Sequence, residues 1–140
     1  MEYVAGFMFS HDNSYLGLIK KTKPEWQKGK LNGIGGKIEV NETPLEAMIR
    51  EFREETGYHH EAWDKFCMLK GDWGTVYFFK AHGDLTQLNT MEEEEIKVLS
   101  VEHILALSKG AVANLSWLIP MAIHIDDVRE NFYTVEEHYK

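Results

Sequence analysis

Three glutamates in one short segment have the spacing to act together. Glu51, Glu54 and Glu55 stand at positions i, i+3 and i+4, so a helix turning by about 100° per residue gathers them in an arc of roughly 100°. Carboxylates this close repel one another, and the negative end of the helix dipole disfavours them further. A hard cation such as Mg²⁺ would reverse that balance, because it prefers oxygen ligands. The alternative is a solvated acidic face that Arg50 and Arg53 relieve.

The segment that carries these acids has clear helix boundaries. Thr43, Pro44 and Glu46 supply an N-cap, a proline at the first helical position and the reciprocal acid of a capping box. The helix should end near Thr56, with Gly57 as its C-terminal cap. Its apolar residues fall on a separate arc and predict the face that packs on the core: Leu45, Met48, Ile49 and Phe52.

A glycine-rich segment, residues 31–38, precedes this helix. Small residues let a backbone turn sharply or approach a ligand closely. Neither a Walker loop nor a dinucleotide-binding pattern fits, because Ile38 stands where the first needs Ser or Thr and the second needs Gly. The preceding residues, 20–30, hold five lysines against the single acid Glu25. This basic stretch is either a solvated loop or a local positive surface beside the glycines.

The remaining pattern predicts further strands and helices. Two runs rich in aromatic and β-branched residues, Tyr3 to Phe9 and Tyr15 to Ile19, flank a turn-forming segment and indicate a hairpin. Further strands are expected at Phe66 to Leu69, Thr75 to Ala81 and Lys97 to Ser100. Helices are expected at Val101 to Leu107 and at Leu115 to His124, the second of them kinked by Pro120.

Length and charge restrict the class of protein. The chain has 140 residues, 44% of them hydrophobic, and we expect a single domain spanning residues 1–140. The formal net charge of −8 disfavours an extended polyanion such as duplex DNA, but not a small polyphosphate met by Mg²⁺ and local lysines. The sequence lacks a signal-peptide pattern, a membrane-spanning run and a second cysteine beside Cys67. We therefore expect a cytoplasmic protein without disulfides.

The acidic helix and its flanks match a longer pattern, G-x5-E-x7-R-E-U-x-E-E-x-G-U, in which U is a bulky aliphatic residue. The matching residues are Gly36, Glu42, Arg50, Glu51, Glu54, Glu55 and Gly57. This segment, residues 36–58, resembles the Nudix box of the Nudix hydrolases. Phe52 and Tyr58 replace the two aliphatic residues and keep their bulk and apolarity.

The resemblance implies a fold and a metal site. The fold would be α+β, a Nudix-type α/β/α sandwich with a mixed central sheet and a loop-helix-loop catalytic motif. Glu51, Glu54 and Glu55 would bind Mg²⁺, for which Mn²⁺ can substitute, and the carbonyl of Gly35 would add a ligand. A carboxylate from the acidic run at residues 92–95 would complete the site, with Glu93 as first choice and Glu95 as second, unless this run is a plain solvated loop.

The same resemblance assigns the remaining catalytic roles. Arg50 and Glu42 would hold the loop and orient the glutamates, and Lys37 would face phosphate. Water activated by the metal would attack phosphorus while cations neutralise the developing charge. A nearby glutamate would act as general base, and Glu54 is our preferred residue for that role, with Glu51 and Arg50 as the other catalytic residues.

The approach to the box bears on the substrate. Residues 31–37 resemble the N-G-x-G-G-K approach of MutT-like nucleoside triphosphate pyrophosphohydrolases, whose Asn can hydrogen-bond a purine edge. Asn32 is therefore a candidate for base recognition or a turn-former. Asn114 is a second candidate, or else the N-cap of the following helix. The aromatic residues that could stack on a base, or lie in the core, are Phe7, Trp26, Tyr77, Phe79 and Trp117.

The expected activity is Mg²⁺-dependent hydrolysis of a (d)NTP, a purine or damaged purine, to NMP and pyrophosphate. An alternative keeps the chemistry and uses another nucleoside diphosphate derivative, such as ADP-ribose, a dinucleoside polyphosphate or an RNA cap. A third interpretation is a regulatory domain that binds a nucleotide without turnover. The partner is in each case a small nucleotide, with no membrane and no bulk nucleic acid, and the oligomeric state, monomer or homodimer, stays open.

Overall fold

A mixed sheet of eight strands organises the part of the chain that the structure, a computed structural model, describes: residues 1–107, 109–125 and 132–138. The main path runs in the order β3-β2-β1-β6-β5-β8, with β4 beside β1 and β7 beside β2. The strands are β1 (Glu2–Phe9), β2 (Tyr15–Lys20), β3 (Leu31–Asn32), β4 (Ile34–Lys37), β5 (Asp64–Gly71), β6 (Gly74–His82), β7 (Glu95–Ser100) and β8 (Tyr133–Glu136). The pairs β1 with β6 and β5 with β8 are parallel, and the others are antiparallel.

The segment formed by β3 and β4 enters the sheet between β1 and β2. The end of β1 at Met8 and Phe9 pairs with β2, whereas its earlier part, from Tyr3 to Gly6, pairs with β4. On the other side of the gap, β3 pairs with Ile19 and Lys20 of β2. The two strands of the hairpin therefore separate along their length, and residues 31–37 fill the space between them.

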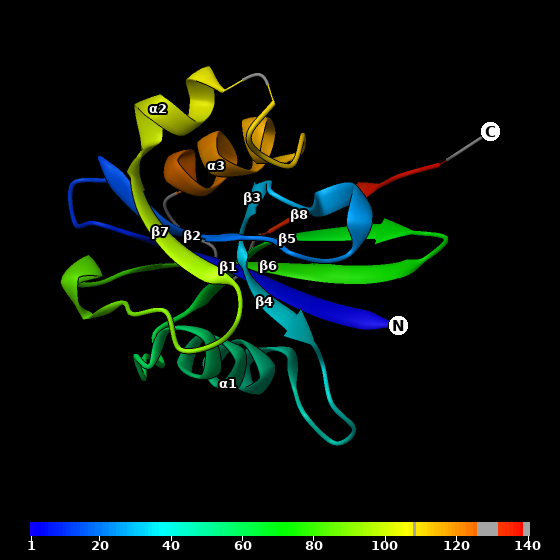
Figure 1. Cartoon of the computed structure of the whole chain (residues 1–140). Helices are drawn as coiled ribbons and strands as arrows, with labels where there is room; N and C mark the ends of the chain where they lie inside the picture. Colours follow the sequence, from blue (N-terminus) through cyan, green and yellow to red (C-terminus); the bar gives the residue numbers. More distant parts are fainter. Residues whose placement is uncertain (108, 126–131, 139–140) are drawn as a thin grey trace.

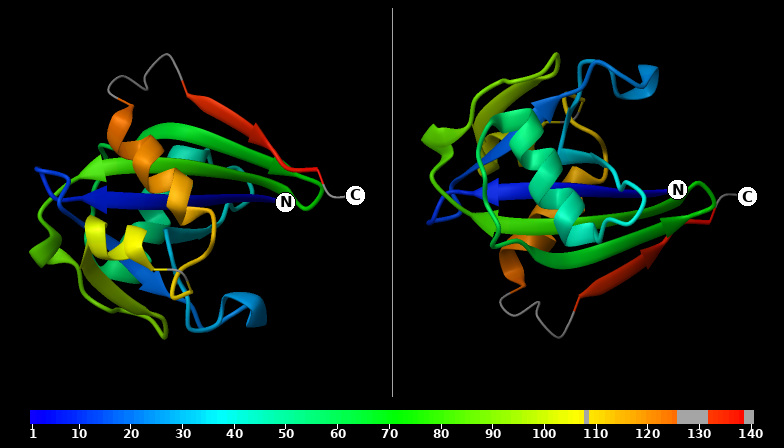
Figure 2. Two further views of the ribbon diagram at one scale, coloured as in Figure 1. Left: turned by 90° about the horizontal axis from the view of Figure 1, so that it is seen from above. Right: turned by 90° about the horizontal axis from the view of Figure 1, so that it is seen from below.

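Helices cover both faces of this sheet. α1 (Pro44–Thr56) lies on one face, and α2 (Val101–Ala106) and α3 (Leu115–His124) lie on the other (Figure 1). The two views of Figure 2, from above and from below, show α2 and α3 over one side of the strands and α1 over the opposite side. Two short 3₁₀ turns, η1 (Glu25–Gln27) and η2 (Leu85–Gln87), lie in the connections. The expected α/β/α sandwich with a mixed sheet is confirmed.

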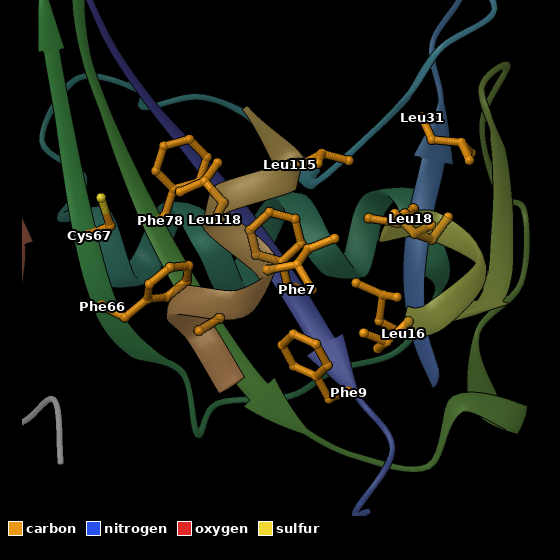
Figure 3. Packing of buried hydrophobic residues seen from close by; sticks show 14 of the residues in the cluster. Phe7, Phe9, Leu16, Leu18, Leu31, Phe66, Cys67, Phe78, Leu115 and Leu118 are labelled. Atoms are coloured by element: carbon orange, nitrogen blue, oxygen red, sulfur yellow. The ribbon is translucent and has the colours of Figure 1, made fainter. Parts of the chain in front are cut away.

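Each face of the sheet has its own apolar core. The core on the α3 side is centred on buried aromatic and leucine side chains that face one another in Figure 3, among them Phe7, Phe66, Phe78 and Leu118. The core under α1 contains Met48, Phe52, Trp63 and Phe79. The alternation of β1 separates the two, because Val4 packs with the α1 core and Ala5 packs against the α3 core.

Most expected elements are present with shifted ends, and three strands were not expected. The glycine-rich segment is not a turn: it forms β3 and β4, and Gly33, Gly35 and Gly36 all have negative φ. These glycines serve close approach, since a β-carbon at Gly35 would collide with the carbonyl oxygen of Val4. The third unexpected strand, β8, pairs with β5 from far along the chain.

Two further expectations concern Cys67 and membranes. Cys67 is a free thiol in the α3-side core, where burial raises its pKa to about 11. In the described ranges, no helix has both the length and the apolarity to cross a bilayer.

Candidate active site

The helix α1 is fixed at both ends, and this defines where its acids point. Thr43 Oγ1 accepts from the Glu46 amide at 3.1 Å, and Glu46 Oε1 accepts from the Thr43 amide at 2.9 Å, which completes the expected capping box. At the other end Gly57 adopts φ = 78°, a left-handed cap in which a side chain would be strained. Met48 and Phe52 bury the apolar face against the sheet.

A glycine brings β4 against the acidic face of this helix. A β-carbon at Gly36 would lie 2.5 Å from Glu51 Cδ and 2.6 Å from its Oε1, so only glycine leaves room for the carboxylate. Glu51 is accordingly confined, with 14% of its side chain exposed, whereas Glu54 one turn later is 47% exposed. The contact explains physically why a glycine and a glutamate at this spacing belong to one site.

Arg50 connects the acids to the loop before the helix. Its Nε and Nη2 donate to the two oxygens of Glu42 at 2.7 and 2.9 Å, and Nη2 also donates to the carbonyl of Lys37 at 3.1 Å. Its Nη1 donates to Glu51 at 2.8 Å and to Glu54 at 3.2 Å. The hydrogen bond from Arg50 holds the pKa of Glu42 below its usual range. One guanidinium therefore ties two of the three glutamates to the end of β4.

The half-buried acids Glu51 and Glu55 are electrostatically unfavourable in their ionised form. Burial raises the pKa of Glu51 despite the contact with Arg50. Burial, and then the charges of Glu51, Glu94 and Glu92, raise the pKa of Glu55 to about 7. Glu55 Oε2 is also buried without a hydrogen-bond partner among the described residues. A carboxylate oxygen in this setting is suited to bind a cation.

The acidic loop at residues 88–95 lies across the C-terminal end of α1. The amides of Asn89 and Met91 donate to the carbonyls of Thr56 and Glu55 at 3.0 and 3.2 Å. These hydrogen bonds satisfy carbonyls that a helix end leaves unpaired. They also place the acidic side chains that follow above the acidic face of α1.

Within that loop the four glutamates have different surroundings. Glu94 is buried, a setting that alone would raise its pKa, but hydrogen bonds from Lys21 Nζ at 2.9 Å and the Thr22 amide at 2.6 Å lower it. Glu95 pairs with Lys97 at 3.3 Å, and Glu93 is exposed. The loop residues whose charges act on Glu55 are thus Glu92 and Glu94, which sequence reasoning had not singled out.

The donor set suits a hard divalent cation, although it is not drawn together in the conformation seen. Among the described ranges, no three acidic, histidine or cysteine side chains converge as a preformed cluster, since Glu54 turns toward Arg50. The available groups are carboxylates and the carbonyls of β4, the ligand types that Mg²⁺ and Mn²⁺ prefer. The unpartnered Glu55 oxygen fits such an ion as well.

Beside the acids of α1, on the α3 side of the sheet, lies a pocket of about 1060 Å³. Its size is at the upper end of the range of ligand-binding clefts. Gly35, Gly36 and Lys37 line its edge next to the acids, and Lys37 is exposed there. A nucleotide lying in the pocket would therefore meet the glycines and a lysine on its way to the glutamates.

Asn114 and Asn32, the two predicted amides, both line this pocket. Asn114 stands at the N-cap of α3 but makes no capping hydrogen bond, and its Oδ1 is buried without a partner among the described residues. Asn32 is a strand residue, not a turn-former: its Oδ1 accepts from the Gly33 amide at 2.8 Å, and its Nδ2 donates to Gln27 Oε1 at 2.9 Å.

The aromatic candidates separate into pocket and core. Trp26 and Trp117 line the pocket, whereas Phe7 and Phe79 are buried in the two cores. Tyr77 is absent from the pocket wall and donates to Glu2 at 2.7 Å. Residues of the pocket that the sequence did not mark are Tyr3, Gln27, Trp73, Val76 and Phe78. Strand alternation could have marked Val76 and Phe78, but no pattern in the sequence marks Gln27 or Trp73.

Comparison with protein families returns one match over most of the chain. The NUDIX domain family matches residues 3–118. The matched residues include the glycine segment, the acidic helix and Asn114, so they cover both the acids of α1 and the two asparagines that line the pocket.

Several solved structures share the fold at low identity. A MutT from a study of Aliivibrio salmonicida and Vibrio cholerae is 22% identical, with a TM-score of 0.70 over 89% of this chain and 97% of that one. MutT from Bacillus halodurans is also 22% identical, with a TM-score of 0.73 over 96% and 88%. The NUDIX domain of Shewanella oneidensis NrtR, in complex with ADP ribose, is 16% identical, with a TM-score of 0.70 over 88% and 86%.

Proposed function

This chain belongs to the Nudix family, and from that premise we propose that it hydrolyses a purine or damaged-purine (d)NTP to NMP and pyrophosphate. Nudix hydrolases act on nucleoside diphosphate derivatives and use divalent metal ions. The proposed cofactor is Mg²⁺, with Mn²⁺ as a substitute. The domain assigned to this activity spans residues 1–140, because β8 joins the same sheet as the matched residues.

One observation carries the proposal. The mutually repelling acids of α1, of which Glu51 and Glu55 are half-buried, adjoin a pocket large enough for a nucleotide at Gly36 and Lys37. The wall of that pocket offers an amide oxygen, Asn114 Oδ1, that is buried without a partner among the described residues. Acids that favour a cation adjoin this pocket at Gly36, and an unsatisfied acceptor that favours a polar nucleobase lines it.

The roles proposed at the acidic end follow from position. Glu51, Glu54, Glu55 and the carbonyl of Gly35 would hold the divalent cation, which supplies charge neutralisation and an acidified water when bound. Glu54, the most exposed of the three acids, is the proposed general base that takes the proton of the attacking water. Arg50 keeps Glu51 and Glu54 oriented, and Lys37 would contact phosphate oxygens.

The acidic loop is proposed to add one more oxygen ligand. Glu93 and Glu95 are the candidates from the sequence, and the charges of Glu92 and Glu94 at Glu55 add those two residues. Single alanine variants compared for the Mg²⁺ concentration that gives half-maximal rate will identify the ligand. The variant that needs the highest Mg²⁺ concentration identifies the ligand. If the Mg²⁺ dependence of the rate is unchanged in all four variants, the loop provides no ligand.

A second candidate keeps the same acidic end and changes the substrate. The pocket volume exceeds what a single base requires, and the similar NrtR domain was solved with ADP ribose. ADP-ribose, a dinucleoside polyphosphate or an RNA cap would fit that description. A binding-only regulatory domain is less well supported, because clustered and repelling acids serve no purpose in it.

Product analysis on a nucleotide panel separates these functions. Pyrophosphate released from dGTP or GTP with Mg²⁺ supports the first, and release of AMP from ADP-ribose together with inertness toward every NTP supports the second. No turnover on the whole panel with Mg²⁺ or Mn²⁺ would contradict both and favour the binding-only role.

A further inference from the structure

Gln27 lies on the wall of the pocket formed by η1, in contact with Asn32. Its Oε1 accepts from Asn32 Nδ2 at 2.9 Å, and its side chain is half-buried. The other end of its amide, Nε2, has no hydrogen-bond partner among the described residues. Because Gln27 lines the pocket, an unpaired donor on its side chain is available to a ligand.

A backbone amide determines which end of Gln27 is free. The Gly33 N–H can only donate, so the Asn32 atom that faces it at 2.8 Å must be oxygen. Asn32 therefore turns its NH₂ group toward Gln27, and Gln27 must answer with its own oxygen. The orientations of both side-chain amides follow from this order of hydrogen bonds, and the NH₂ group of Gln27 takes no part in it.

The backbone around Gln27 holds this arrangement in place. The backbone amide of Gln27 donates to the carbonyl of Pro24 at 2.9 Å, and its backbone carbonyl accepts from the amide of Lys30 at 2.8 Å. The backbone amide of Lys21 donates to the carbonyl of Lys30 at 2.9 Å. The neighbouring wall is tied to the same unit, because Leu31 donates to Gly110 and accepts from Val112, both at 2.9 Å. The donor of Gln27 is therefore presented on a closed loop beside the wall that carries Asn114.

We propose that Gln27 determines base specificity by donating from Nε2 to a carbonyl oxygen of the base, with Asn32 as the positioning residue that sets its direction. The inference rests on the proposed nucleotide function of the pocket. Guanine presents O6 as an acceptor where adenine presents an N6 amino donor. Adenine would oppose donor to donor at this point, so 6-oxopurines are the preferred class.

Equilibrium binding of GMP and AMP, measured by calorimetry, tests this without turnover. The wild-type protein should bind GMP more tightly than AMP by about tenfold or more. This is the loss of affinity expected when bound AMP leaves one donor buried without a partner. Gln27→Glu presents an acceptor in place of the donor, so the ratio of the GMP affinity to the AMP affinity should fall below one. Gln27→Met lacks both groups and no charge enters, so its ratio should approach one.

The positioning role of Asn32 has its own test. In Asn32→Asp, one oxygen still accepts from Gly33 and the other requires a donor from Gln27, which turns the Gln27 oxygen toward the pocket. The GMP to AMP ratio should therefore fall as in Gln27→Glu, although Gln27 itself is unchanged. Gln87→Glu in η2, outside the pocket wall, adds the same charge as Gln27→Glu and should leave the ratio unaltered.

Three results would overturn the inference. They are a wild-type preference for AMP, a ratio that Gln27→Glu leaves unchanged, and a ratio that Gln87→Glu shifts equally. A change with Asn32→Asp but none with either Gln27 variant would make Asn32 the residue that contacts the base. If no NTP is hydrolysed but the affinity ratios change as expected, the proposed reaction fails and the assignment of Gln27 stands. If NTPs are hydrolysed but the affinity ratios do not change, the proposed reaction stands and the assignment of Gln27 fails.

Discussion

The acidic end of this cleft and the part proposed to bind the nucleobase, called the base end below, are built in different ways. The acidic end takes its helix, its glycine and its arginine from residues 36–58, and one capped helix with a single close approach positions them. The base end collects residues from Tyr3 to Glu137 and depends on loops joined through β3. The groups proposed for the reaction are therefore encoded in one segment, whereas the choice of substrate is a property of the assembled fold.

The largest effect is expected from a variant that removes the proposed general base, Glu54. Glu54→Ala should lower kcat by about 10²- to 10⁴-fold, the range for loss of a general base, and by the same factor for every nucleotide. Pyrophosphate release from dGTP and dATP measures it. Glu102→Ala, which removes an exposed acid on α2, is the control and should keep full activity. Near-full turnover in Glu54→Ala would exclude Glu54 as the base.

A methyl group at the close approach should affect the same end. In Gly36→Ala the new carbon would press on the Glu51 carboxylate, so we expect kcat to fall by about 10- to 100-fold through misplacement. Gly110→Ala, whose β-carbon would meet Leu107 at 3.3 Å, is the control with an unchanged rate. An active Gly36→Ala enzyme would show that Glu51 need not occupy its present place.

At the base end the expected change is in binding. Asn114→Leu removes a buried oxygen without a described partner, so KM for a purine NTP should rise about tenfold while kcat changes little. The free protein should be as stable or about 1 kcal/mol more stable, because an unsatisfied acceptor is lost. Steady-state kinetics and urea unfolding measure both, with Ser116→Ala as the neighbouring control. Marked destabilisation would show that Asn114 supports the fold instead.

The smallest effect is expected in stability without metal. Between the ordinary glutamate pKa of 4.5 and about 7, folded Glu55 holds a proton that the unfolded chain has lost. Stability should therefore fall as pH rises through this window. In EDTA, Glu55→Gln should be more stable than the wild type by about 1–3 kcal/mol above pH 7, and the two should converge near pH 4.5.

Urea unfolding at pH 5 and pH 8 measures this difference. Added Mg²⁺ should stabilise the wild type more than Glu55→Gln, because the ion removes the repulsion that the variant already lacks. An identical gap at both pH values would show that Glu55 is ionised normally in the folded protein.

The sequence predicted the elements whose signals are local. α1 carries its caps and its apolar stripe within a few residues, so its bounds were predictable. β8 was not, because its pairing with β5 depends on a partner about 65 residues earlier. β3 and β4 were not predicted either, since the sequence does not reveal that the glycines make room for Val4 and Glu51.

The site follows the same rule. The acids of the box could be named from their spacing, whereas the part of the acidic loop that reaches Glu55 depends on how residues 88–95 lie over the helix end. Asn32 and Asn114 were identified as polar residues of the base end, but not the hydrogen bonds that distinguish them. Gln27 lies in a basic stretch whose composition indicates a solvated loop or a positive surface, and neither interpretation points to an uncharged amide.

The alternation of β1 has a consequence for how such a protein can change. The side chain of Val4 packs in the core on the α1 side and that of Ala5 against the core on the α3 side, so adjacent codons serve separate cores. Point substitutions on the pocket side can accumulate while the residues under α1 stay fixed. An insertion or deletion of one residue in β1 would exchange the two sides at once. Mutant libraries made by substitution should therefore yield new substrate preferences far more often than libraries made by single-residue deletion.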